Sequence, residues 1–146
     1  MQKFIIALLI LSFSTNSTNA QKPEIFQTNG QAINGYDAVA YFSESRPIKG
    51  FDSLFKEWNN TVWYFSTISN LELFIKNPEQ YAPQYGGYCA YGTASGYKAP
   101  TQSDAWAIVD GKLYFNYSKK VKEMWEKDRS GYIEKANLNW PSIKNK

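Results

Sequence analysis

Cys89 is the side chain in this sequence that could take part in the most kinds of chemistry, because a thiolate can bind a soft metal ion, act as a nucleophile or form a disulfide. It is the only cysteine, so an internal disulfide is excluded. The chain has no histidine, which removes the commonest metal ligand and the usual general base. The other donors on offer are Met124 and carboxylates such as Asp37. Cys89 and Asp37 are therefore the candidate ligands of a soft metal ion such as Cu(I) or Zn(II).

Each of these residues also has a structural interpretation. Cys89 lies in a segment rich in glycine and tyrosine, where a buried and inert thiol, a reactive thiol and one half of an intermolecular bridge all stay open. Asp37 follows Gly35 and Tyr36 in a predicted turn, where a carboxylate commonly accepts hydrogen bonds from the local backbone. Met124 falls on the apolar stripe of a predicted helix, so we expect it in the core.

Catalysis by the thiol has little support in the sequence. A cysteine nucleophile needs a base or a helix amino terminus to hold the thiolate. Without histidine that role falls to Lys56, Lys98 or a carboxylate, and nothing in the spacing links these to Cys89. We therefore expect a non-enzymatic protein, with a thiol-dependent enzyme or redox protein as an alternative.

The amino terminus has the pattern of an export signal. A positive start at Lys3 precedes the apolar run 4–11, and the small-residue exit Thr18-Asn19-Ala20 follows. The apolar run is about half of the roughly 20 residues that a membrane anchor needs. We therefore predict a cleavable signal peptide at 1–20, no stable membrane anchor, and an exported protein in a periplasm or outside the cell.

The remaining chain predicts an α+β fold in which a small antiparallel sheet is built from hairpins and helices pack on one side. Residues 21–31 are polar and indicate a flexible lead-in, and 32–146 form one domain. The first predicted hairpin turns at Asn59–Asn60. A helix capped by Ser69 and Glu72 follows, with an inward face expected at these residues: Leu71, Phe74 and Ile75.

A second hairpin, turning at Asp110–Gly111, repeats the scheme, and its turn is the strongest local signal in the chain. The helix after it is expected to bury Met124 and its neighbours Val121 and Trp125. Ser130–Gly131 is expected to end that helix, and a last helix is predicted over 132–139, before Pro141.

Several stretches carry a resemblance that extends over nearly all of residues 32–141. They are GYDAVAYF at 35–42, VWYFS at 62–66, NPEQY at 77–81, YAPQYGGYCAYG at 81–92 and IVDGKLY at 108–114. Together they resemble the YHS domain proteins, most closely the small exported bacterial branch. The resemblance implies an association with heavy metals, often copper, so a copper-type ion is the implied cofactor.

This chain differs from the YHS pattern at the positions of the metal-ligating residues. The metal-associated YHS pattern has a pair of cysteines near its opening turn, absent here, and a second pair after the strand ending in Phe65, where Ser66 and Asn70 stand. Members of the exported branch commonly have a histidine near the position of Lys56. The resemblance therefore implies a metal-related accessory module that has lost most of the usual ligands.

The amino-acid composition limits the classes of molecule that this protein is expected to bind. Lys and Arg number 16 and Asp and Glu 13, so the net charge of +3 creates no strong field and we expect no nucleic acid partner. Five tryptophans and eleven tyrosines exceed the needs of a small core, although we expect most of the tryptophans inside it. An aromatic-rich module that binds a protein or a carbohydrate, with Cys89 purely structural, is the alternative function. We expect a monomer or weak oligomer whose partner is a protein or a metal ion.

Overall fold

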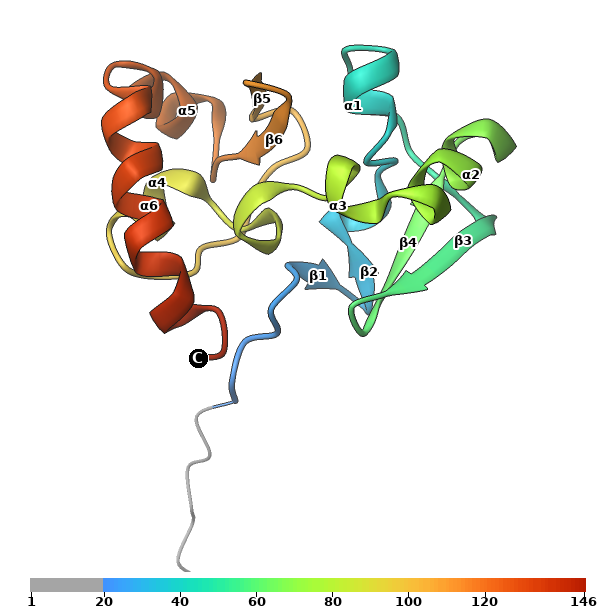
Figure 1. Ribbon diagram of the computed structural model, residues 1–146, viewed down its shortest axis with the longest axis horizontal. Coiled ribbons are helices and arrows are strands. Elements are labelled where there is room, and N and C mark those ends of the chain that lie inside the picture. Colours follow the sequence, from blue (N-terminus) through green and yellow to red (C-terminus); the bar gives the residue numbers. More distant parts are fainter. Residues whose placement is uncertain (1–19) are drawn as a thin grey trace, which may run out of the picture.

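The structure is a computed structural model and describes residues 20–146 (Figure 1). The expected signal peptide lies outside the described residues, apart from Ala20. The strands are β1 (Gln27–Thr28), β2 (Gln31–Ala32), β3 (Phe51–Trp58), β4 (Thr61–Phe65), β5 (Trp106–Val109) and β6 (Lys112–Phe115). The helices and helical turns are η1 (Ile33–Gly35), α1 (Ala40–Ser43), α2 (Ile68–Lys76), α3 (Pro78–Tyr81), η2 (Gln84–Gly87), α4 (Ala90–Ala94), α5 (Lys119–Glu126) and α6 (Arg129–Ile143). These elements confirm the predicted α+β class.

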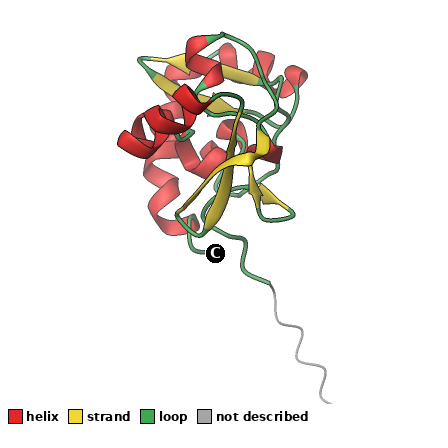
Figure 2. Ribbon diagram, turned by 90° about the vertical axis from the view of Figure 1, so that its right-hand side faces the viewer, coloured by secondary structure: helices red, strands yellow, loops and turns green. Residues whose placement is uncertain are grey.

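The elements lie in two halves, side by side (Figure 1). The first half holds a four-stranded sheet of order β1-β2-β4-β3 with α1, α2 and α3, and the second holds the β5–β6 hairpin with α4, α5 and α6. Figure 2 shows the strands in two separate sheets. All strand pairs are antiparallel except β2 with β4, which pair in parallel. Within residues 20–146, no helix is long and apolar enough to cross a membrane.

Both predicted hairpin turns are confirmed. Asn59 and Asn60 have φ of 51° and 57°, and Asp110 and Gly111 have φ of 51° and 73°. Two consecutive residues with positive φ are typical of the type I′ turn, whose twist matches that of the flanking strands. The turn residues therefore determine the register of β3–β4 and of β5–β6.

Strand β6 separates two hydrophobic cores. Leu113 and Phe115 point into the first core, whereas Tyr114 between them points into the second. This division follows from the alternation of side chains along a strand. Tyr41 of α1 ties the first half to the same hairpin, because its ring lies edge-on to Phe115 and its hydroxyl donates to Ser103 O at 2.9 Å.

The predicted cap and face of α2 need correction. Thr67, not Ser69, caps the helix, since its hydroxyl oxygen accepts from Asn70 N at 3.0 Å. The buried positions are Asn70 and Phe74, and Ile75 is 51% exposed. The polar Asn70 is drawn inward by the buried carboxylate of Asp37, to which it donates, and this sets the rotation of the helix.

The last two helices also differ from the prediction. Ser130 and Gly131 lie in the first turn of α6, because Asp128 caps that helix by accepting from Gly131 N at 3.2 Å. The helix then continues through Pro141 instead of ending before it. Met124 is exposed, contrary to the core position expected, because α5 buries only Trp125.

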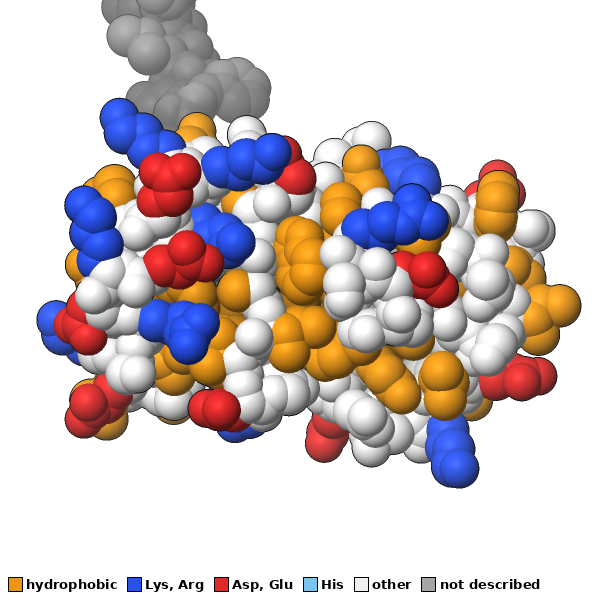
Figure 3. Space-filling view, turned by 90° about the horizontal axis from the view of Figure 1, so that it is seen from above, with side chains coloured by type: hydrophobic (Ala, Val, Ile, Leu, Met, Phe, Trp, Pro, Cys, Tyr) orange, Lys and Arg blue, Asp and Glu red, His pale blue; other side chains and the backbone are white. Residues whose placement is uncertain are grey.

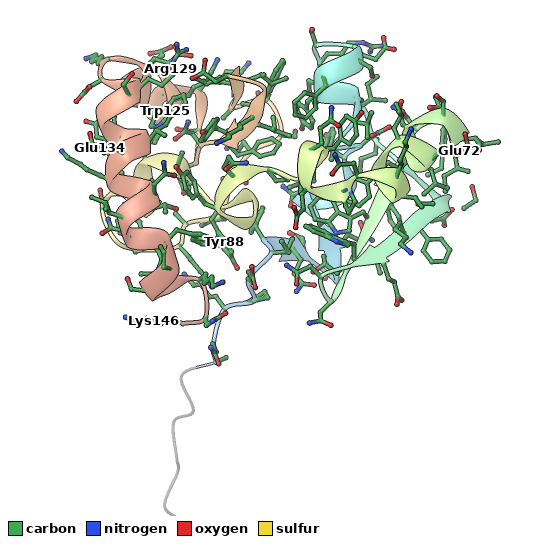
Figure 4. All side chains as sticks on the ribbon, in the orientation of Figure 1. Glu72, Tyr88, Trp125, Arg129, Glu134 and Lys146 are labelled. Atoms are coloured by element: carbon green, nitrogen blue, oxygen red, sulfur yellow. The ribbon has the colours of Figure 1, made fainter. Side chains whose placement is uncertain are left out.

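Residues 22–27, called the strap below, were expected to belong to a flexible lead-in, and that prediction was wrong. The strap runs between the two halves (Figure 1) and ends in β1, which pairs with β2. Ile25 of the strap is buried in the first core. On the other side Phe26 N donates to Gly86 O at 2.8 Å, and Tyr88, labelled in Figure 4, donates its hydroxyl to Pro23 O at 2.8 Å. Backbone hydrogen bonds and the buried Ile25 hold the strap in place, while Lys22 and Pro23 at its start are exposed.

Gly86 permits this approach of two backbones. Its φ is 62°, and a Cβ at that position would lie 1.9 Å from Glu24 O. A Cβ contact below 3.0 Å requires the backbone to move. The junction of the strap with η2 therefore requires glycine for both conformation and space.

Gly86→Ala is expected to lower the free energy of unfolding by about 3 kcal/mol, because the strap must lift away from η2. Gly96→Ala is the matched control, since Gly96 also has positive φ (88°) but has open space around the Cβ position. That control should cost only about 1 kcal/mol, the penalty of a left-handed alanine. Denaturant titration of both variants measures the difference, and equal losses would contradict the packing role of Gly86.

Candidate functional site

Asp37 is fully buried and its carboxylate is saturated with donors. One oxygen accepts from the backbone N–H groups of Val39 at 2.9 Å and Ala40 at 3.2 Å. The other accepts from the Ser66 backbone at 2.8 Å, the Ser66 hydroxyl at 2.6 Å and Asn70 Nδ2 at 2.7 Å. Five bonds exceed the roughly four lone-pair positions of a carboxylate, so none is left for a metal ion.

This network occupies the place where the YHS resemblance implies metal ligands. Ser66 and Asn70 stand at the positions where that pattern has cysteines, and both donate to Asp37. The Asn70 amide nitrogen has no lone pair available for a metal ion, and the Ser66 hydroxyl is a poor substitute for a thiolate toward a soft ion. The arrangement joins the turn before α1 to the turn before α2, which is a structural role.

Cys89 is also buried, at 1% exposure, and caps the short helix α4. Its Sγ accepts from Gly92 N at 3.4 Å and from Tyr117 N at 3.2 Å, and lies 3.6 Å from Asn116 Oδ1, to which the thiol donates. Burial raises the pKa of the thiol, and the backbone N–H groups of Gly92 and Tyr117 oppose that shift. The result is a neutral thiol sealed inside the second half.

Asn116 is the polar residue that completes this cluster. Its Oδ1 accepts from Tyr91 N at 3.2 Å as well as from the thiol. Its Nδ2 and Trp125 Nε1 are the buried side-chain nitrogens without a hydrogen-bond partner in the described part of the chain. No sequence pattern marks Asn116 as a buried polar residue, because it follows β6 as an ordinary polar residue.

The predicted ligand set does not fit a copper-type ion. Within residues 20–146 no group of three or more Cys, Asp, Glu or His side chains is placed to hold a metal ion. Asp37 belongs to the turn before α1 in the first half and Cys89 to the second half, and their hydrogen-bond partners are different residues. A single buried thiol offers a soft ion one of the two to four donors that it requires.

The lysines considered as partners for the thiol lie elsewhere. Lys56 is exposed on β3, and Lys98 is 5% exposed with its ammonium among backbone carbonyls. Lys98 Nζ donates to Lys22 O at 3.0 Å, to Pro23 O at 3.1 Å and to Lys144 O. It therefore joins the strap to the end of α6, and burial lowers its pKa while the nearby Glu24 carboxylate opposes that shift.

A groove of about 410 Å³ lies where the strap, the first half and the second half meet; it is called the inter-half groove below. Its lining combines two indoles with carboxylates and carboxamides. The side chains used below are Glu24, Trp58, Asn59, Glu79, Gln84, Asn137 and Trp140. Neither Cys89 nor Asp37 lines it.

Tyr85 gives the groove its fixed wall. Its φ of 57° is unusual for a bulky side chain, and such conformations cluster at functional sites. The hydroxyl lies 2.9 Å from Asn137 Oδ1 and 3.3 Å from Ile133 O, so it is held against α6. Burial raises the pKa of this hydroxyl, which stays a neutral donor.

Sequence reasoning missed the inter-half groove because it placed most tryptophans in the core. Trp63 and Trp125 are fully buried, whereas Trp58, Trp106 and Trp140 are only partly buried. Trp58 and Trp140 come from opposite halves, and only the fold brings them to one groove. On the face seen in Figure 3, Lys and Arg side chains are interspersed with Asp and Glu, and apolar side chains lie between them.

Comparisons of the chain with protein-family models, with curated proteins and with solved structures give no match. The YHS resemblance therefore stays a prediction.

Asp37→Asn is expected to lower the free energy of unfolding by about 3 kcal/mol, because an amide NH₂ would face buried donors that lose their acceptor. Urea titration followed by tryptophan fluorescence measures the loss. Asp104→Asn is the matched control, since Asp104 makes an exposed ion pair with Lys119 at 3.2 Å. That change should cost less than about 1 kcal/mol, and a similar cost for Asp37→Asn would contradict the role given to the network.

Cys89 in the folded protein is expected to react with a thiol reagent about 100-fold more slowly than in denaturant, because the thiol is buried and neutral. Rapid labelling of the folded chain would contradict the sealed thiol. In a parallel titration under reducing conditions, Cu(I) should bind the natural chain and Cys89→Ala equally weakly. One tightly bound ion per chain that disappears in Cys89→Ala would restore the metal hypothesis.

Proposed function

We propose that this protein is an exported, non-enzymatic binding module of YHS type, and that it binds a neutral saccharide in the inter-half groove. The observation that carries the proposal is that Trp58 and Trp140, from opposite halves, line one groove together with polar side chains. Ligand sites are commonly concave, occur between structural units, and combine aromatic walls with a few polar groups that orient the ligand.

The lining chemistry matches the two kinds of surface of a sugar ring. The C–H faces of a sugar are apolar and suit an indole, which is large, rigid and tolerant of a wet boundary. The hydroxyl groups at the ring edge both donate and accept. Carboxylates of Glu24 and Glu79 accept, and the carboxamides of Asn59 and Gln84 do both.

A neutral ligand fits the charges better than an ionic one. Among residues 20–146, Glu24 and Glu79 line the groove and no lysine or arginine does, so an anionic sugar would meet repulsion. The saccharide is favoured over a peptide, because two indoles line the groove together with two carboxylates and three carboxamides.

The metal role implied by the resemblance receives no support from the donor set described above. Asp37 and Cys89 serve as hydrogen-bonding centres of the two halves, which favours the alternative in which Cys89 is structural.

Titration calorimetry with neutral trisaccharides of glucose, xylose, mannose and N-acetylglucosamine tests the proposal. At least one should bind with a Kd below about 1 mM, a free energy near −4 kcal/mol. Trp140→Leu should weaken that binding about tenfold or more, and Glu79→Ala, which changes an exposed side chain, should weaken it severalfold.

Trp106→Leu is the matched control, because Trp106 is a half-buried indole outside the groove. It should leave binding unchanged. Absence of binding by every sugar, or binding only of a peptide library, would overturn the saccharide proposal. Release of new reducing ends during the titration would overturn its non-enzymatic part.

A further inference from the structure

We infer that the ligand of the inter-half groove is a chain of sugar units rather than a single sugar, and that Asn59 and Asn60 hold successive units. This inference rests on the proposed saccharide binding. It follows from two more cavities that continue the groove along the strap and across the tip of the first hairpin.

Neighbouring cavities have lining residues in common. A second cavity of about 330 Å³ shares Glu24, Ile25 and Asn59 with the inter-half groove. A third, also of about 330 Å³, shares Gln27, Asn60 and Thr61 with the second. Residues 24–27 of the strap contribute to all three, so the cavities lie side by side along the strap, and together they are called the depression below.

Each turn asparagine lies at a junction between cavities. Asn59 lines the first and second, and Asn60 lines the second and third. A carboxamide donates and accepts, so it can bond to hydroxyls of the two sugar units on either side of a glycosidic link. Both asparagines are exposed and their side chains make no hydrogen bond within the described chain.

The second position of the first hairpin turn holds a carboxamide where glycine is common. Asn-Gly and Asp-Gly are the favoured pairs for a type I′ turn, and the second hairpin has Asp110-Gly111. The first hairpin has Asn60 where that glycine would be, at φ 57°. Asparagine also tolerates this φ, so the turn forms without glycine and leaves a carboxamide beside the second and third cavities.

The charges along the depression change sign from cavity to cavity. Glu24 and Glu79 line the first, Lys22 and Lys144 are added in the second, and Glu57 lines the third. A uniformly charged polymer would meet at least one repulsive stretch, whereas a neutral chain would not.

The test is a length series, from one to six units, of whichever sugar binds in the trisaccharide panel. Affinity should rise about tenfold or more between one and three units and then level off. Asn60→Gly creates an Asn-Gly turn that keeps the fold. It should weaken binding of the longer oligomers about threefold to tenfold and leave the monosaccharide unchanged.

Asp110→Asn, in the turn of the second hairpin away from the groove, is the matched control and should have no effect at any length. If the monosaccharide binds as tightly as the hexamer, or Asn60→Gly changes nothing, the chain-binding inference is overturned and the saccharide site stands. If no length binds at all, the proposed function itself fails.

Discussion

The approach of the strap to Gly86 is the constraint on which the rest of the structure depends. The backbones of Glu24 and Gly86 are so close that no side chain fits between them, and Phe26 N donates across the same junction. The contact places the strap between the halves, where Lys98 and Tyr88 hold its start. The inter-half groove is lined by this strap, so its shape follows from a backbone contact and not from the side chains that face a ligand.

Asp37 and Cys89, the side chains best suited to metal binding or catalysis, instead stabilise the fold. Asp37 accepts five hydrogen bonds and so joins α1 to the turn before α2, while Cys89 and Asn116 form the corresponding centre of the second half. A carboxylate with all its lone pairs bonded and a buried thiol cannot bind a metal ion unless their surroundings rearrange. Removal of the Asp37 carboxylate would leave buried donors unpaired, which costs about 1–3 kcal/mol for each.

Local patterns were sufficient to predict what local forces determine. The turn residues Asn59–Asn60 and Asp110–Gly111 gave both hairpins, and the expected local backbone bonds of Asp37 are present. Positions determined by distant partners were not predictable: Ile75 is exposed because Asn70 is held by Asp37 on the opposite side of α2. The strap was misjudged for the same reason, since its polar sequence says nothing of the carbonyl groups that Lys98 and Tyr88 bind.

The groove could not have been predicted because its walls come from segments that are far apart in the sequence, Trp58 and Trp140 above all. Two elements hold the halves that carry these tryptophans in position. One is the strap, and the other is β6, which contributes to both cores. Walls that are held in place before a ligand arrives cost little further ordering on binding, and this preorganisation increases affinity. Because the ligand would bridge the two halves only when they are folded, its binding free energy would add to the stability of the whole domain.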